Sequence, residues 1–333
     1  MSGRSESRYR AALVGLGRIA SLLEDDRLRE KPATHAGALH ANPRTTIVGG
    51  CDIDRERRNR FAGRWNVLTV TETIQELLER ESPDILVIAT HPDSHEYYLR
   101  QAVGFGVPVV TCEKPLAHTI RAARRMKRLV QRNVATRVIV NHERRYSRDY
   151  RLVRDAVEHK RFGDLLSVTG TLHFSRTQRL DRTFLHDGTH LIDAINFLSC
   201  GSVRLRHRSA SLKSTASTVF LEGSIAPAGI PVSIHVGTGR DYLQFLVDLS
   251  FSEGRIQIGN GIFQWEISRQ SPFYDTYRSL VNMERRRPEP SEYFSAMVAD
   301  AVGLLDYPHR QPVSSIDDAY EVMKTVGGLL IRL

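Results

Sequence analysis

The chain has 333 residues, of which 41% are hydrophobic and 26% are charged, and its formal net charge is +9. This length predicts two domains, and the composition is that of a globular protein rather than a disordered or fibrous one. No apolar run is long enough to cross a bilayer, so no membrane partner is expected. The polar segment Met1–Arg10 lacks an apolar core, which argues against a secretory signal.

The surplus of basic residues does not predict a nucleic-acid partner. The arginines are spread over nearly the whole chain, and no recognition-helix or aromatic RNA-binding pattern accompanies them. They indicate either a solvated basic surface or attraction of an anionic substrate such as a phosphosugar or a nucleotide sugar.

The three cysteines, Cys51, Cys112 and Cys200, lie far apart in the sequence. They form neither a metal-finger spacing nor a disulfide framework. This usage favours a reducing, cytoplasmic setting.

The first 140 residues alternate short apolar runs with helical patterns. The runs are rich in Val and Ile and mostly lack polar alternation, which is typical of strands buried on both faces of a parallel sheet. Thr73 with Glu76, and Thr119, are expected to cap two of the intervening helices. The pattern predicts a doubly wound parallel α/β sheet, a Rossmann domain, over residues 1–140. The expected strands are Ala11–Val14, Thr46–Cys51, Val67–Val70, Ile85–Ala89, Val107–Cys112 and Arg137–Val140.

Strand patterns dominate residues 141–333, which are predicted to form a second α/β domain for substrate binding and oligomerisation. Helices are expected over Tyr150–Arg161 and from Ile316 onward, and Ser252-Glu253-Gly254 predicts a hairpin turn. The charged run Glu284–Pro288 is expected to be an exposed loop. The strands should form an antiparallel sheet with one covered face. They are expected at Leu165–Phe174, Ser217–Gly223, Val232–Gly237, Leu243–Phe251 and Arg255–Ile267.

A G-x-G-x-x-A pattern, Gly15 to Ala20, follows the first expected strand. Gly15 permits the tight turn, and Gly17 lets the backbone approach a pyrophosphate at the N-terminus of a helix. Because the motif lies between a strand and a helix, it predicts a dinucleotide site that also includes Arg18 and Ile19.

The second expected strand is followed by Asp52, whose carboxylate can accept hydrogen bonds from an adenosine ribose. The distance from the glycines is long because Glu24–Thr34 looks like an inserted loop. Asp52 favours NAD, since a carboxylate repels the 2′-phosphate of NADP. The nearby basic residues could hold that phosphate or simply lie on the helix surface, so NADP stays an alternative cofactor. They are Arg55, Arg57 and Arg58.

The segment Glu113-Lys114-Pro115, directly behind the fifth expected strand, resembles the Gfo/Idh/MocA family of oxidoreductases. The resemblance implies a Rossmann domain joined to an α/β domain with a large, open, mostly antiparallel sheet. It also implies oxidation or reduction at a sugar or cyclitol carbon. It covers most of the chain from Arg10 to about Cys200 and continues through Ala89–Pro92, Asn141–Tyr146 and Gly188–Asp193.

The resemblance implies that Lys114 contacts both the substrate hydroxyl and the nicotinamide ribose, with a Lys114–Pro115 bond that is often cis. Oxidation of an alcohol requires removal of the hydroxyl proton as the hydride leaves, and a lysine amine can share in that transfer. Further residues near the nicotinamide end of the cofactor site are expected to be Thr90, His91, His95, Glu113 and Asn141. For the two histidines, helix capping and packing are the alternative.

The family's second motif is usually Asp-x-Gly-x-His, and the matching stretch here is His186-Asp187-Gly188-Thr189-His190. His190 matches the family histidine, whereas His186 stands where the family has an aspartate. His186 can substitute as a polar partner, Asp187 can take the role after a local shift, or the chemistry is altered or lost.

Several weaker candidates complete the expected site. Arg144 or Arg145 can bind an anionic group of the substrate, or both can be solvated charges at a hinge. His173 and Tyr242 are candidates for the substrate pocket or for ordinary sheet packing. The two histidine pairs at i, i+4 lack further ligands, so no metal site is predicted.

Three functions agree with this pattern. The first is an NAD(P)-dependent dehydrogenase or reductase that acts on CH–OH groups of a polyol or sugar-like substrate. The second uses transient oxidation to drive elimination or glycosidic cleavage, and the third is a non-catalytic cofactor-binding sensor or partner-binding protein. A homodimer or homotetramer through the C-terminal sheet is expected, because an open sheet with an apolar face needs a cover.

Overall fold

The computed structural model describes residues 8–174, 176, 179–209 and 217–331 and divides into two compact units. The first unit comprises Met1–Tyr146 with Glu292–Tyr320, and the second comprises Ser147–Ser291 with Glu321–Leu333. This differs from the single boundary expected at residue 140, because the chain returns to the first unit after residue 291. Of the polar N-terminal segment, residues 1–7 lie outside the described part of the chain.

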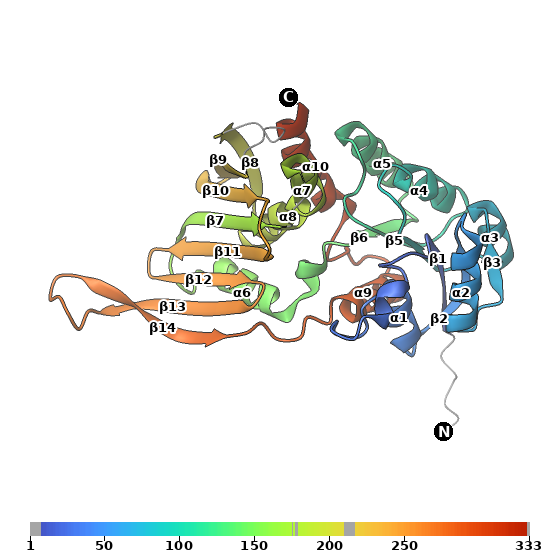
Figure 1. The fold of residues 1–333 in the computed structure, drawn as a ribbon, viewed down its shortest axis with the longest axis horizontal. Coiled ribbons are helices and arrows are strands. Elements are labelled where there is room, and N and C mark those ends of the chain that lie inside the picture. Colours follow the sequence, from blue (N-terminus) through green and yellow to red (C-terminus); the bar gives the residue numbers. More distant parts are fainter. Residues whose placement is uncertain (1–7, 175, 177–178, 210–216, 332–333) are drawn as a thin grey trace, which may run out of the picture. The chain divides into compact units, whose positions relative to one another are not determined.

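The first unit contains a parallel sheet with the strand order β3-β2-β1-β4-β5-β6 (Figure 1). This order confirms the predicted doubly wound Rossmann fold. A Cβ atom added to Gly49 would meet Leu77 of α3, whereas one on Gly50 would meet Phe61 of α2, so helices cover both faces of the sheet. The elements are β1 (Tyr9–Val14), η1 (Leu22–Asp25), α1 (His35–Ala41), β2 (Thr45–Cys51), α2 (Arg55–Trp65), β3 (Thr69–Thr71), α3 (Ile74–Glu81), β4 (Ile85–Ile88), α4 (His95–Gly104), β5 (Val109–Cys112), α5 (Ile120–Arg132), β6 (Arg137–Val140), η2 (Glu143–Tyr146) and α9 (Tyr293–Asp306).

Side-chain caps begin the helices at the predicted places. The hydroxyl of Thr73 accepts a hydrogen bond from the backbone N–H of Glu76 at 3.4 Å, and Thr119 accepts one from Ala122 at 3.2 Å. Each cap satisfies a backbone donor that has no partner within its helix.

The returning segment completes the edge of the Rossmann sheet. The hydroxyl of Ser314 donates to the carbonyl of Val140 at 2.7 Å, and the Val140 N–H donates to the carbonyl of Ser314 at 2.9 Å. The buried carboxylate of Asp300, on α9, accepts a hydrogen bond from the Tyr146 hydroxyl at 2.9 Å. Residues 292–320 therefore belong structurally to the nucleotide-binding unit.

The second unit contains an eight-stranded sheet in the order β14-β13-β12-β11-β7-β10-β9-β8, in which β7 and β10 are parallel and the other neighbours antiparallel. The mostly antiparallel sheet is confirmed, as is the hairpin turn between β11 and β12. The elements are α6 (Arg148–Glu158), β7 (Leu165–His173), α7 (Leu180–His186), α8 (Gly188–Leu198), β8 (Ser202–Arg208), β9 (Thr218–Ala226), β10 (Ile230–Gly237), β11 (Gln244–Phe251), β12 (Gly254–Gly259), β13 (Ile262–Gln270), β14 (Arg278–Arg286) and the part of α10 (Ile316–Ile331) that follows Tyr320.

Two sequence predictions for this unit were wrong. The single strand expected at Arg255–Ile267 is two strands, because Gly261, with φ at +82°, turns the chain between β12 and β13. The charged run expected as a loop is partly strand, since Glu284–Arg286 end β14.

One face of this sheet is covered by α6, α7, α8 and α10, whose apolar side chains share a core with β-strand residues such as Val247 and Ile256. The opposite face was expected to be apolar, but it carries polar side chains. On it Arg255 donates to the Asp248 carboxylate at 2.9 Å and lies 3.9 Å from Glu266. This face is therefore not the apolar surface from which the sequence analysis predicted an oligomer.

No helix in residues 8–174, 176, 179–209 and 217–331 is long and apolar enough to span a membrane.

Candidate functional site: a nucleotide-binding edge and a histidine corner

The glycine-rich turn after β1 has the geometry that a dinucleotide requires. Gly15 has φ at +81°, and a Cβ atom there would lie 2.7 Å from the carbonyl oxygen of Ala89, so only glycine fits between these two loops. At Gly17 the nearest atom to an added Cβ is a guanidinium nitrogen of Arg57, at 3.8 Å. The open backbone at Gly17 fits the approach of a pyrophosphate.

The helix expected directly after Ala20 is replaced by a single turn and η1. The α1 helix begins only at His35, whose N–H donates to the carbonyl of Ile19 at 3.2 Å, and the Ala36 N–H donates to the carbonyl of Ala20 at 2.9 Å. The chain therefore makes one turn after the glycine motif and then forms the predicted inserted loop. It starts α1 only after this loop, and the first N–H groups of α1 bond back to the turn. Arg18 in this turn is exposed.

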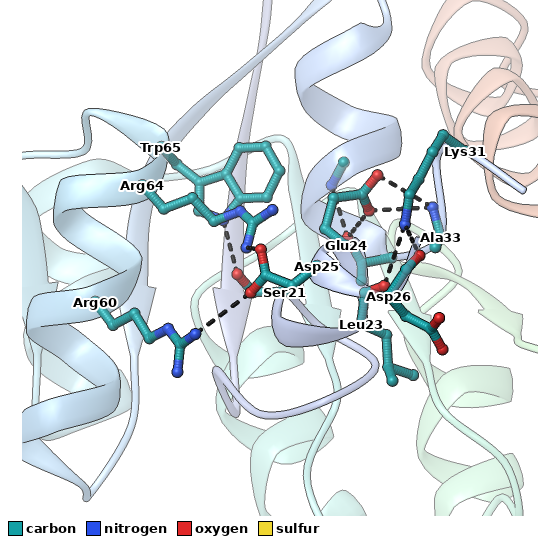
Figure 2. Close-up of polar contacts among 12 residues, drawn as sticks. Ser21, Leu23, Glu24, Asp25, Asp26, Lys31, Ala33, Arg60, Arg64 and Trp65 are labelled. Atoms are coloured by element: carbon teal, nitrogen blue, oxygen red, sulfur yellow. Dashed lines mark hydrogen bonds and ion pairs between the residues drawn. The ribbon is translucent and has the colours of Figure 1, made fainter. Parts of the chain in front are cut away.

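Polar contacts hold the inserted loop against its neighbours (Figure 2). The Glu24 carboxylate accepts hydrogen bonds from the Ala33 N–H at 3.0 Å and the Thr34 hydroxyl at 2.6 Å. Asp25 accepts a hydrogen bond from Arg64 of α2 at 2.7 Å. The loop therefore closes on itself and attaches to the neighbouring helix, so that α1 begins at a fixed place.

Asp52 follows β2 and lies beside the glycine turn. Its side chain is 5% exposed and accepts hydrogen bonds from the N–H groups of Leu16, at 2.8 Å, and Asp54, at 2.9 Å. The half-exposed guanidinium of Arg57 lies 3.7 Å from the same carboxylate, whereas Arg58 donates to the carbonyl of Asp52 at 2.7 Å. Asp52 and Arg57 therefore lie together where the adenosine ribose of a dinucleotide would bind.

The segment that carries Lys114 begins at a buried carboxylate. Glu113 accepts hydrogen bonds from the His35 Nε2 at 2.7 Å and the Asn141 Nδ2 at 2.6 Å, and its other oxygen accepts one from the Lys114 N–H at 3.3 Å. Lys114 itself is half-buried and its bond to Pro115 is cis.

The charge of Glu113 is stabilised despite its burial. Burial raises its pKa, but the bonds and charge of His35, the bond from Asn141 and the charge of Lys114 lower the pKa to about 2. Glu113 and Asn141 were expected to contact cofactor, yet their polar groups bond to each other. Sequence reasoning missed His35, because no local pattern reveals a partner 78 positions away.

His95 is fully buried, which agrees with the packing alternative that the sequence left open for it. Its Nε2 lies 3.1 Å from the carbonyl oxygen of Thr90, and its Nδ1 lies 3.2 Å from that of Leu116. Burial lowers the pKa of His95 against the effect of these contacts. The ring therefore connects the loop after β4 to the loop after β5, which contains Lys114, while His91 is exposed.

The second candidate group lies at the corner between α7 and α8, within the second unit. The Nδ1 of His186 lies 3.1 Å from Oδ1 of Asp187, and the side chains are 62% and 20% exposed. The other oxygen of Asp187 is buried and has no hydrogen-bond partner among the described residues. The His190 N–H donates to the carbonyl of Asp187 at 3.1 Å, so the corner brings the three candidates together.

The side chain of Arg145 is buried and contacts other residues of the same unit. Its side chain is 6% exposed, lies 3.2 Å from Asp318 and donates to the carbonyl of Val313 at 3.4 Å. Burial raises the pKa of Asp318, but the charge of Arg145 and bonds from Ser315 lower it. The other candidate arginine, Arg144, has its guanidinium 3.2 Å from Glu143.

His173 and Tyr242 lie close together at one end of the second sheet. Their ring centroids are 6.4 Å apart, and the Nδ1 of His173 lies 3.0 Å from Oε1 of Gln244. In the described part of the chain no cluster of three or more His, Cys, Asp or Glu side chains could hold a metal ion.

The doubly wound sheet, the glycine turn and the buried aspartate after β2 define a protein of the dinucleotide-binding Rossmann class. Residues 9–142 match the sequence model of the Gfo/Idh/MocA family, described as an oxidoreductase family with an NAD-binding Rossmann fold. The nucleotide-binding domain of this chain is therefore similar to that of the family.

A comparison with curated proteins finds YteT of Bacillus subtilis, which is named as an oxidoreductase. It is 26% identical over 188 residues, which are 51% of this chain and 41% of YteT. The chain therefore matches about two fifths of the length of this relative.

Solved structures resemble the whole fold. An oxidoreductase domain protein from Kribbella flavida has a TM-score of 0.79 at 16% identity, over 98% of this chain and 96% of that one. A myo-inositol 2-dehydrogenase from Lactobacillus plantarum has 0.75 at 18% identity, over 98% and 97%. The WlbA dehydrogenase of Bordetella pertussis, solved with NADH and UDP-GlcNAcA, has 0.73 at 19% identity, over 96% and 94%. At these identities the similarity establishes the fold.

Proposed function

We propose that this protein is an NAD(P)-dependent oxidoreductase that transfers a hydride between nicotinamide and a hydroxyl or keto carbon of a sugar, cyclitol or sugar derivative. The observation that supports it best is the position of Lys114. This residue follows β5 at the carboxyl edge of the parallel sheet, where ligands of such sheets bind. Its segment is fixed by the buried carboxylate of Glu113.

The chain's own residues would hold the nucleotide and move the proton. Gly15 and Gly17 leave room for the pyrophosphate, and Asp52 accepts hydrogen bonds from the ribose. When bound, the cofactor supplies the hydride acceptor or donor. The Lys114 amine takes the hydroxyl proton in oxidation and returns it in reduction. On the second unit, His190 is the proposed acid–base partner, with His186 or Asp187 assisting.

The substrate class is suggested by the proteins that share the fold. One is named a myo-inositol 2-dehydrogenase, and another was solved with NADH and UDP-GlcNAcA. Both names fit a polyol or sugar derivative, and a basic chain with net charge +9 fits an anionic one. A cytoplasmic location is also part of this proposal, since Cys51, Cys112 and Cys200 are all free.

The experiment compares Lys114→Ala with Lys160→Ala, an exposed lysine in an ion pair with Asp164. NADH binding is followed by fluorescence, and turnover is followed on a panel of polyols, sugar acids and nucleotide sugars. Lys114→Ala should keep its NADH affinity and lose turnover by at least about 100-fold, whereas the control keeps both. Normal turnover in Lys114→Ala would remove the proposed role.

A second candidate function, a non-catalytic cofactor-binding protein, is favoured by one observation. His186 stands where the family pattern has an aspartate, and its side chain is 62% exposed. Tight NADH binding with no turnover on the panel, but with activity gained in His186→Asp, would favour this alternative.

We also propose a homodimer or homotetramer through the C-terminal sheet. Exposed apolar side chains gather on β14 and the β13–β14 connection, including Phe273 at 79% and Met283 at 51% exposure. Such side chains favour burial against a second copy. Sedimentation equilibrium measures the assembly, and Phe273→Asp should weaken it if this edge is used.

A further inference from the structure

We propose that Arg240, together with His173 and Tyr242, forms a binding site in the second unit for a carboxylate or phosphate group of the substrate. This inference rests on the proposed function and specifies its substrate as an anionic sugar or sugar acid. No role for Arg240 followed from the sequence pattern.

The backbone brings these residues to one end of the sheet. The parallel strands β7 and β10 end at His173 and Gly237, and β11 starts beside them at Gln244. Gly239, with φ at +75°, turns the chain after β10 and directs Arg240 back toward the strand end. The three side chains therefore come from adjacent strand ends.

Gly237 provides the space in which Arg240 and His173 meet. A Cβ atom added to Gly237 would overlap the guanidinium of Arg240 and would lie 2.8 Å from the His173 ring. A larger residue at this position would separate the two side chains. The cation and the imidazole therefore occupy one site rather than two separate surfaces.

The charge of Arg240 is held in place without being neutralised. Its guanidinium donates to the Thr218 hydroxyl at 2.8 Å and to the carbonyls of Thr238 at 2.9 Å and Ser217 at 3.3 Å. All three acceptors are uncharged. Within the described residues no carboxylate lies at ion-pair distance from it, and the adjacent Asp241 pairs with Arg176 at 3.0 Å.

A guanidinium fixed in this way is suited to an anion. Three of the five N–H donors make the bonds above, and the remaining two belong to a planar fork that matches carboxylate and phosphate oxygens. Because its position is set by neutral bonds, little side-chain entropy is lost when an anion binds. A surface arginine with no such bonds would bind the same anion less specifically.

His173 adds an uncharged hydrogen-bonding group beside this cation. Burial and the positive charge of Arg240 lower the pKa of His173, against the bond to Gln244. Because Oε1 of Gln244 is an acceptor, Nδ1 of the neutral ring donates to it at 3.0 Å. This leaves Nε2 as an acceptor for a hydroxyl, and the 53% exposed Tyr242 adds a phenolic donor.

The same end of the sheet carries the candidate catalytic corner of this unit. Near the C-terminal end of α8, Asn196 accepts a hydrogen bond from the Val203 N–H at the start of β8. Since β8 runs parallel to β7 through their pairing with β9 and β10, the N-terminus of α8 points toward the end where His173 lies. The anion site is thus at the same end of the sheet as Asp187 and His190 but on the opposite face, because Gly170 faces α8 and His173 lies an odd number of positions further along β7.

The test measures binding of two simple anions to the NADH-saturated protein by calorimetry. L-tartrate presents carboxylate groups and inorganic phosphate presents a phosphate group. Comparing their affinities shows which of the two groups the site binds. Arg240→Gln removes the charge and keeps amide donors, Arg240→Lys keeps the charge, and Arg176→Gln is the control on a neighbouring exposed arginine. NADH affinity is measured separately for every variant.

We expect at least one anion to bind wild type with a dissociation constant below about 10 mM. Arg240→Gln should weaken binding about tenfold or more, with NADH affinity unchanged, and Arg176→Gln should stay within about threefold of wild type. Arg240→Lys should weaken binding less than Arg240→Gln, because it keeps the charge but loses the planar fork. Affinity in the wild type should also fall as NaCl is raised, which tests the charge without any substitution.

Equal anion affinity in Arg240→Gln and wild type, or no anion binding to wild type that binds NADH, would overturn the inference. If Arg240→Gln does not fold, a wild-type affinity that does not change with salt overturns it instead. Loss of NADH binding in the wild type would contradict the proposed function and not this site.

Discussion

The Nε2 atom of His35 lies 2.7 Å from Oε1 of Glu113, although the two residues are 78 positions apart. His35 is the first residue of α1 after the inserted loop, and Glu113 directly precedes Lys114. The His35 ring also packs edge-on against Phe294 of α9, with centroids 5.1 Å apart. The carboxylate that precedes Lys114 is therefore held by His35, and the His35 ring is in turn packed against α9.

Replacing His35 should destabilise the protein and misplace Lys114. In His35→Leu the carboxylate of Glu113 keeps its burial and loses a partner, which should cost about 3 kcal/mol of unfolding free energy. His35→Gln should recover part of this loss because it keeps a donor. Urea unfolding measures both, with His159→Leu, a substitution on a histidine whose side chain is 73% exposed, as the control. Equal stability of His35→Leu and the control would contradict the argument.

Glu113 should make the stability of the fold sensitive to acid. Its pKa falls from 4.5 for an unperturbed group to about 2, so the folded state resists protonation of this carboxyl. The contribution of Glu113 is present above pH 4.5 and is lost as the pH falls toward 2. It amounts to up to about 3 kcal/mol. As the pH is lowered from 4.5 toward 2, the measured unfolding free energy should fall less steeply in Glu113→Gln than in wild type. Parallel curves for the two proteins would contradict the predicted contribution of Glu113.

Gly17 should be required for the cofactor but not for the fold. An alanine Cβ at Gly17 would meet only a guanidinium nitrogen of Arg57 at 3.8 Å, so Gly17→Ala should fold normally. The same methyl group would obstruct the pyrophosphate and should weaken NADH binding about tenfold or more. Gly63→Ala, at a helical glycine with no atom within 4 Å of an added Cβ, is the matched control. Fluorescence titration and thermal unfolding separate the two effects.

The choice between NAD and NADP should depend on Asp52 and Arg57. Asp52→Asn keeps an oxygen acceptor for the Leu16 N–H but removes the charge that repels a 2′-phosphate. The ratio of NADPH to NADH affinity should rise about tenfold in this variant. Arg57→Ala should lower NADPH affinity more than NADH affinity, since its half-exposed guanidinium lies 3.7 Å from the Asp52 carboxylate. If the ratio of NADPH to NADH affinity is unchanged in both variants, residues other than Asp52 and Arg57 discriminate between the two cofactors.

The features that local sequence could predict are those set by local chemistry. Buried Val and Ile runs predicted strands of the parallel sheet, and Thr73 and Thr119 cap helices as expected. Gly15 has the positive φ, and Gly17 the open space, that the nucleotide motif requires. Each of these follows from residues within a few positions of one another.

The features that local sequence missed depend on distant partners or lack a pattern. No residue near Arg145 in the sequence indicates that Arg145 is buried in an ion pair with Asp318. Likewise, no residue near His95 indicates that its ring contacts two backbone carbonyls. The strand β14 has largely exposed side chains on both faces, so it shows no alternation that predicts a strand. In the second sheet, the polar face centred on Asp248 and Arg255 was hidden because alternation does not say which face the helices cover.

The return of residues 292–320 to the first unit also affects the order in which the protein is made. While the ribosome synthesises the second unit, the Tyr146 hydroxyl still lacks Asp300, and the edge strand β6 still lacks Ser314. The domain whose synthesis begins first therefore stays incomplete until most of the chain has emerged. A nascent chain that stops before residue 292 should expose the apolar surface that α9 covers and should be a substrate for chaperones.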